Sequence, residues 1–171
     1  MKHIFFIIIF LFSTGCSIFN TLGQQPKHTI NLTEAIYYVG LNENIDRVQL
    51  KRFLNVDPVT TEWCAAFINA VLARNNISNL HDFNSKRPLL AQEFLNYGEI
   101  ILEEELRYGD IIIIERPGAK WQGHVGFFMG IRHSRGQKYY LLLGGNQNNK
   151  VSIAPYSSKK LIGMRRYSNY K

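Results

Sequence analysis

The chain has 171 residues, of which 46% are hydrophobic and 19% are charged. These values exclude a disordered protein, and the length favours one domain with its own core over two domains. The formal net charge is +7, but no run of Lys and Arg is interleaved with aromatic residues. The charge therefore fits a solvated surface, or an anionic partner such as a membrane or cell wall, and we expect no nucleic-acid partner.

The N-terminus, "MKHIFFIIIFLFSTGC", has the three parts of an export signal. A basic start at Lys2 and His3 precedes an apolar run over residues 4–12, and small residues lead up to Cys16. The apolar run is about half the ~20 residues that a membrane-spanning helix needs. The pattern predicts a cleavable signal over residues 1–15.

The cysteine directly after "STG" resembles the lipobox of bacterial lipoproteins, although Ser13 stands where leucine is most usual. The resemblance implies that Cys16 is acylated and begins the mature chain, which makes the protein an exported, membrane-anchored lipoprotein of the cell envelope. Residues 16–31 are then the lipidated cysteine and a polar tether to the domain. The alternative is an ordinary secretory signal that is cut elsewhere, with Cys16 incidental.

Helical patterns fill the first half of the domain. Residues 44–55 are amphipathic, because Leu50, Phe53 and Leu54 follow the i, i+3, i+4 spacing of a helix. The other helices are expected over residues 32–43, 62–74 and 88–97, the last closed by Gly98.

After residue 98 the pattern of hydrophobic residues changes from that of helices to that of short strands. Five short segments are rich in β-branched and aromatic residues and are separated by Gly, Asn, Ser and Pro; they cover residues 109–116, 123–133, 138–147, 150–156 and 161–167. Helices first and an antiparallel sheet second predict an α+β domain over residues 32–171, with the helices packed on one face of the sheet.

Cys64 lies in the first turn of the helix expected over residues 62–74. With Thr61 as N-cap it is the third helical residue, where the helix N-terminus favours a thiolate and free N–H groups can hold an oxyanion. If Cys16 carries lipid, Cys64 is a lone thiol in an exported protein. The alternative is a buried structural cysteine, because Cys64 shares a helical face with Phe67 and Val71.

A thiol nucleophile needs a base, and His124 is the best placed of five histidines. It opens the apolar strand "GHVGFFMG", where Gly123 and Gly126 leave room for something to approach, although a turn could also satisfy such a histidine. In the next strand, "LLLGGNQNN" would bring Asn146 or Gln147 near the imidazole to fix its tautomer, although the stretch also resembles a simple turn.

Together, "WCAAF", "GDI", "GHVGFFMG" and "LGGNQNNKVSI" resemble the NlpC-type and CHAP-type cysteine peptidases and amidases of bacterial cell walls. The resemblance implies a papain-like core with Cys64 as nucleophile, His124 as base and Asn146 as the third residue. Gln147 is the second choice for that role, and Trp63 is a candidate substrate-binding residue. We expect no cofactor, and no metal because HExxH and CxxC motifs are absent.

The predicted activity is hydrolysis of a peptidoglycan amide bond by a Cys-His-Asn thiol mechanism, as a stem-peptide endopeptidase or an amidase. One alternative is a catalytically inactive peptidoglycan-binding lipoprotein of the same fold. Glu62 motivates it, because proline often precedes the tryptophan in related sequences and a carboxylate there would oppose thiolate formation. A thiol acyltransferase or deamidase on the same core is a third possibility.

Overall fold

A computed structural model describes residues 30–116, 118 and 122–168 of the chain. The export signal, Cys16 and nearly all of the tether lie outside the described residues, so their predictions stay predictions. Within the described ranges, no helix combines the length and the apolar character that a membrane span requires.

Three α-helices come first in the described part of the chain, α1 (Thr33–Tyr37), α2 (Arg47–Leu54) and α3 (Cys64–Arg74). The helix expected over residues 32–43 is shorter than predicted, since the backbone turns at Gly40 with φ +97°. Leu50, Phe53 and Leu54 are buried, as the spacing in α2 predicts, and Asn55 ends that helix in the left-handed conformation at φ 57°.

The helix expected over residues 88–97 is a 3-10 helix, η1 (Ala91–Asn96), and not an α-helix. Two further 3-10 turns, η2 (Glu103–Glu105) and η3 (Ser158–Lys160), connect strands. Gly98 follows η1 with φ +77° and lets the chain pass against the ring of Tyr167, where a Cβ atom would lie 2.7 Å from the ring.

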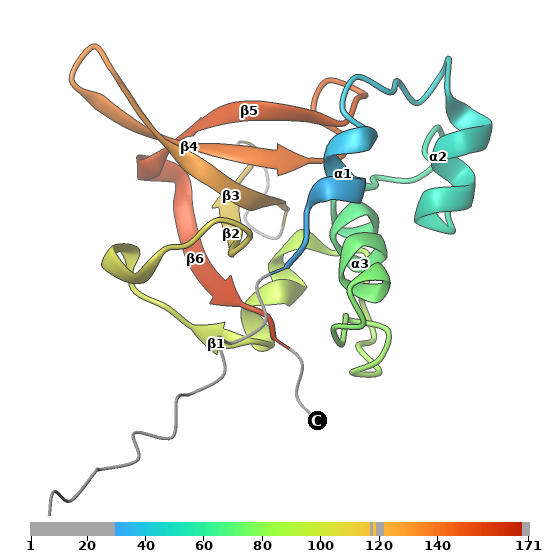
Figure 1. Cartoon of the computed structure of the whole chain (residues 1–171), viewed down its shortest axis with the longest axis horizontal. Helices are drawn as coiled ribbons and strands as arrows, with labels where there is room; N and C mark the ends of the chain where they lie inside the picture. Colours follow the sequence, from blue (N-terminus) through green and yellow to red (C-terminus); the bar gives the residue numbers. More distant parts are fainter. Residues whose placement is uncertain (1–29, 117, 119–121, 169–171) are drawn as a thin grey trace, which may run out of the picture.

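Six strands form one antiparallel sheet in the order β1-β6-β2-β3-β4-β5. They are β1 (Glu99–Ile100), β2 (Ile111–Glu115), β3 (Gly123–Ser134), β4 (Gln137–Gly144), β5 (Ser152–Ser157) and β6 (Leu161–Arg166). The sequence missed only β1, which has two residues and too short a pattern to detect. The helices lie on one side of the strongly curved sheet (Figure 1), so the predicted α+β layout is confirmed.

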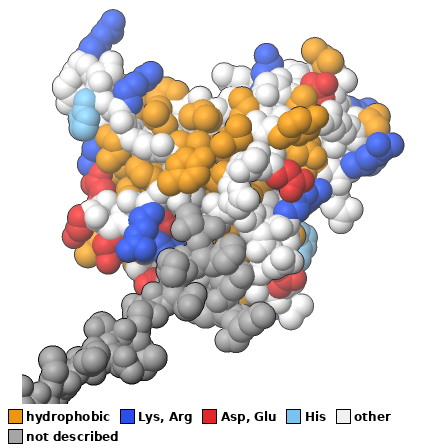
Figure 2. All heavy atoms as spheres, viewed as in Figure 1, with side chains coloured by type: hydrophobic (Ala, Val, Ile, Leu, Met, Phe, Trp, Pro, Cys, Tyr) orange, Lys and Arg blue, Asp and Glu red, His pale blue; other side chains and the backbone are white. Residues whose placement is uncertain are grey.

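The sheet separates two hydrophobic cores. Ile111 and Ile113 of β2 belong to the larger core, which α3 covers, whereas Ile112 and Ile114 belong to a smaller core on the opposite face. A strand buried on both faces accounts for the unbroken "IIII" run. Hydrophobic side chains also gather across the middle of one molecular face, with Lys and Arg mainly at its margins (Figure 2).

Candidate active site

Cys64 is the first residue of α3 and is 7% exposed. The prediction that Thr61 caps this helix is wrong, because Trp63 occupies the N-cap position and no side chain caps the helix. Cys64 is therefore the first and not the third helical residue. The first N–H groups of a helix have no intrahelical partner; at the start of α3, the N–H of Ala65 donates to the Cys64 sulfur.

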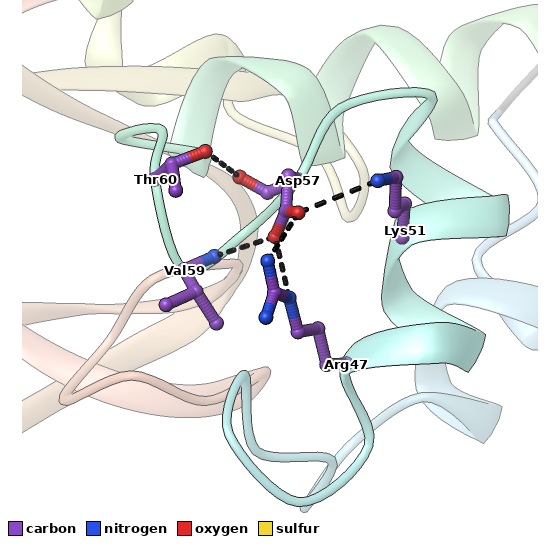
Figure 3. Close-up of polar contacts among 5 residues, drawn as sticks. All are labelled: Arg47, Lys51, Asp57, Val59 and Thr60. Atoms are coloured by element: carbon purple, nitrogen blue, oxygen red, sulfur yellow. Dashed lines mark hydrogen bonds and ion pairs between the residues drawn. The ribbon is translucent and has the colours of Figure 1, made fainter.

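The segment that leads into α3 is held by Asp57. The carboxylate accepts hydrogen bonds from the Arg47 guanidinium at 2.9 and 2.6 Å and from Lys51 at 3.4 Å, both on α2 (Figure 3). The same residue accepts from the Val59 N–H and from the Thr60 hydroxyl. These contacts join the chain before the cysteine to α2, and the Arg47 hydrogen bond holds the pKa of Asp57 well below its usual value.

Trp63 is fully buried and does not line the cavity beside Cys64. Its indole N–H donates to the Glu43 carboxylate at 2.8 Å. Its ring packs so closely on Gly145 that a Cβ atom there would lie 2.5 Å from it. The proposed substrate contact of Trp63 is thus wrong, because the core takes the ring; Trp63 instead packs the start of α3 against the chain that follows β4.

His124 lies near the start of β3, opposite Ile114 of β2, and is half-buried. The other two described histidines, His81 and His133, are exposed. The room left by Gly126 is filled by protein, because a Cβ atom there would lie 2.9 Å from Leu142. That glycine serves strand packing and not the approach of a ligand.

Gln147 is the residue that the structure brings to the imidazole. Its side-chain oxygen lies 3.1 Å from Nε2 of His124. Its amide nitrogen donates to the Ser152 carbonyl at 2.5 Å and to the Ser152 hydroxyl at 2.9 Å, and lies near the carbonyls of Leu142 and Gly144. Because the nitrogen faces acceptors, the oxygen faces the ring; we assign the proton to Nε2 and leave Nδ1 as the free base.

No hydrogen bond joins Asn146 to His124, contrary to the first choice made from the sequence, although both residues line the same cavity. Its backbone is left-handed at φ 57°, and its side chain turns outward to donate to Glu62 at 2.7 Å. The longer Gln147 side chain is 6% exposed and points inward from the next position. Because of this turn, Gln147 and not Asn146 is bonded to His124. The alternation of side chains along a strand could not predict which of the two would be.

Cys64, His124 and Gln147 line one cavity of about 280 Å³. Tyr156 joins them in the wall, and the charged residues around the cavity are Glu62, Glu115, Arg116 and Lys160. Arg116 donates to Glu62 at 3.1 Å, so the carboxylate expected to oppose the thiolate has a cationic partner. Sequence analysis missed Arg116 and Tyr156, because only the folded sheet brings the ends of β2 and β5 to the cysteine.

Burial affects the pKa of the Cys64 thiol more than the helix N-terminus does. Desolvation raises the pKa of Cys64 to about 11, although the N–H groups of Val125 and Ala65 act in the opposite direction. The helix N-terminus favours the thiolate as expected, but desolvation outweighs it in the free protein. The structure also has no hydrogen bond between the sulfur and the imidazole, both of which lie in described segments and face the same cavity.

The imidazole is neutral as well. Desolvation lowers the pKa of His124 to about 4, while the bond to Gln147 and the charge of Glu62 raise it. Desolvation in this cavity therefore disfavours a thiolate on Cys64 and an imidazolium on His124 when either forms alone. Transfer of the thiol proton to the imidazole creates both charges together, and their attraction offsets part of that cost.

Asp110, the polar residue of the "GDI" motif, lies outside this cavity. It is buried and accepts two hydrogen bonds from Arg166, at 2.8 and 2.7 Å, and one from the Arg107 N–H. In the described residues, no three His, Cys, Asp or Glu side chains lie close enough to hold a metal ion. Asp110 thus joins β2 to β6 and takes no part in the cavity.

No family model matches the chain, and no curated protein matches it. Among solved structures, the chain is similar to an NlpC/P60 family protein from Bacillus cereus, with 20% identity and a TM-score of 0.42. The similarity covers 62% of this chain and 32% of that one, so the chain spans about a third of the length of the structure it matches.

Proposed function

We propose that the protein is a thiol hydrolase that cleaves an amide bond of peptidoglycan. The observation that carries the proposal is one cavity lined by a helix-start cysteine and by a histidine whose Nε2 is bonded to a buried glutamine. These are the nucleophile, base and orienting group of a cysteine hydrolase. The choice of peptidoglycan is supported by the ordered motifs and the export signal, which resemble those of exported cell-wall enzymes.

The reaction begins with the substrate carbonyl above Cys64. His124 Nδ1 takes the thiol proton while the sulfur attacks the carbonyl carbon, and free N–H groups at the start of α3 stabilise the oxyanion. The carbon–nitrogen bond breaks when His124 returns the proton to the leaving amine. Water, with His124 again as base, then hydrolyses the thioester and restores the thiol.

The papain-like core, the lipid on Cys16 and the location in the cell envelope are parts of the same proposal. Lipid on Cys16 would hold the enzyme at a membrane beside its polymeric substrate. Treatment of cells with a labelled fatty acid tests this part: we expect label on the wild-type chain and none on Cys16→Ser. Label that persists in Cys16→Ser would contradict the lipobox.

Digestion of purified peptidoglycan by the full chain tests the activity. We expect wild type to release fragments, and Cys64→Ala and His124→Ala to release none while their melting curves stay cooperative. Asn146→Ala is the matched control for the neighbouring amide, because Asn146 also lines the cavity but donates to Glu62 and has no hydrogen bond to the imidazole. Mass spectrometry of the fragments distinguishes an endopeptidase, which exposes an amino group in the peptide, from an amidase, which frees the glycan.

A second candidate is a peptidoglycan-binding protein without activity, and the buried neutral thiol favours it. In that case the full chain would sediment with peptidoglycan yet release nothing, and Cys64→Ala would bind as well as wild type.

A further inference from the structure

Tyr156 is a cavity residue to which the reaction described above gives no task. It lies in β5, and its ring stacks on the imidazole of His124 with centroids 5.0 Å apart and an interplanar angle of 29°. The ring also packs against the smaller core, which contains Ile114, the residue paired with His124 across β2 and β3. The tyrosine therefore lies between the core and the proposed base.

One hydrogen bond leaves the imidazole free to turn. The bond to Gln147 fixes the position of Nε2, but the second side-chain torsion of histidine has a broad energy minimum. A rotation about that torsion moves Nδ1, the atom that must face the thiol. An aromatic ring stacked on the face of the imidazole restricts this rotation, because tilting would lose the stacking contact.

We propose that Tyr156 is a positioning residue for His124: its ring fixes the plane of the imidazole that Gln147 aligns, and it shields their hydrogen bond from water. The proposal rests on the proposed function only for the task of His124 as base. The phenol stays protonated, because burial raises the pKa of Tyr156 to about 12. The ring face, and not a charge on the oxygen, is thus the active feature.

Titration of His124 by NMR in the full chain, with labelled histidine, tests the proposal without any turnover. The difference spectrum of His124→Gln assigns the resonance. The titratable and charged groups that share the cavity with His124 are Cys64, Glu62, Glu115, Arg116, Tyr156 and Lys160. The variants at Tyr156 change only that one of the six. In wild type we expect a titration midpoint near the low pKa of about 4 and a slowly exchanging Nε2 proton.

The variants separate the ring from the hydroxyl. Tyr156→Phe keeps the ring, and we expect it to retain the midpoint and the slowly exchanging proton. Tyr156→Leu removes the stacked face, and we expect the midpoint to rise by about one pH unit or more towards the ordinary ~6.5 and the proton to exchange fast. Tyr108→Leu is the control for loss of a tyrosine, because Tyr108 is 44% exposed and outside the cavity lining.

Tyr156→Met, which fills the site without an aromatic face, gives a second measurement if Tyr156→Leu unfolds. An unchanged midpoint in the folded Leu or Met variant would overturn the proposal, and so would a shift in Tyr156→Phe as large as theirs. In turnover we expect kcat to fall about tenfold or more in the Leu or Met variant at constant KM, because the base is misplaced. If wild type releases no fragments but the titration pattern holds, the hydrolase proposal fails and the positioning of His124 by Tyr156 stands.

Discussion

The side-chain oxygen of Gln147 lies 3.1 Å from Nε2 of His124, and its amide nitrogen is held by Ser152. This relationship assigns the ring tautomer and hence the atom that can accept the thiol proton. Loss of the amide should cost roughly 100-fold in turnover, within the range expected for general-base catalysis. We expect this loss in Gln147→Ala and a near-normal rate in Asn146→Ala, measured by fragment release; the reverse order would restore Asn146 as the orienting residue.

The thiol should be slow to alkylate in the free protein. Because burial raises the pKa of Cys64 to about 11, the reactive thiolate is scarce at neutral pH and increases only as the pH rises towards that value. Mass spectrometry after iodoacetamide treatment at several pH values measures this. Fast labelling of Cys64 near pH 7 in the folded chain would contradict the buried, neutral thiol.

Glu62 and Arg116 should shift that labelling in opposite directions. The carboxylate raises the pKa of Cys64 and the guanidinium lowers it, each less than burial does. At one moderately alkaline pH, Glu62→Gln should label faster than wild type and Arg116→Gln more slowly. The effects should be small, since both side chains are more than half exposed, and added salt should reduce them. Equal shifts in the same direction would point to a change of structure instead.

The half-buried, desolvated imidazole should make the fold sensitive to acid. The pKa of His124 is lowered to about 4 in the folded protein, whereas the unfolded chain binds the proton near pH ~6.5. Between these values only the unfolded state is protonated, so stability falls as pH falls from about 6.5 to about 4, by up to about 3 kcal/mol.

Urea unfolding of wild type and His124→Gln over that pH range checks the sign. The variant should lack this part of the pH dependence, while the parts due to other groups remain. A wild-type stability that rises on acidification, or two parallel curves, would exclude a neutral buried imidazole.

Gly145 should tolerate no side chain while Trp63 is present. A Cβ atom there would lie 2.5 Å from the indole, and forced overpacking of this kind costs about 1–3 kcal/mol. Thermal melts of Gly145→Ala in the wild-type and Trp63→Leu backgrounds form a double-mutant cycle. A Cβ atom would also lie 2.7 Å from the Cβ of Phe67, so we expect the alanine to lower the Tm in both backgrounds, but less in the second; equal losses would show that the indole is not the cause.

Local patterns predicted the elements well where one face had to be buried. The spacing of Leu50, Phe53 and Leu54 identified the inner face of α2, and the β-branched run at residues 111–114 identified β2 as a strand, although its burial on both faces was learned from the structure. The residue at which a helix begins was harder to predict. Thr61 is of a residue type that often caps helices. In the structure, however, Trp63 packs in the core at the N-cap position and α3 begins at Cys64.

Part of the candidate site could also be predicted from local patterns. Cys64 and His124 stand at the starts of regular elements, where a polar residue in an apolar pattern is noticeable in the sequence. The choice between Asn146 and Gln147 depended on one left-handed residue in a turn, which alternation along a strand does not reveal. Tyr156 depended on the curvature of the sheet, which brings β5 to a histidine that its neighbouring strand does not carry.

Digestion of peptidoglycan in water enriched in oxygen-18 tests the central claim most directly. If Cys64 forms a thioester that water hydrolyses, each newly released carboxylate carries one oxygen-18 atom, and Cys64→Ala produces no such fragment. Fragments without the label would indicate transfer to another acceptor. Labelled fragments from a folded Cys64→Ala variant would show that the hydrolysis does not use this thiol, and would contradict the account.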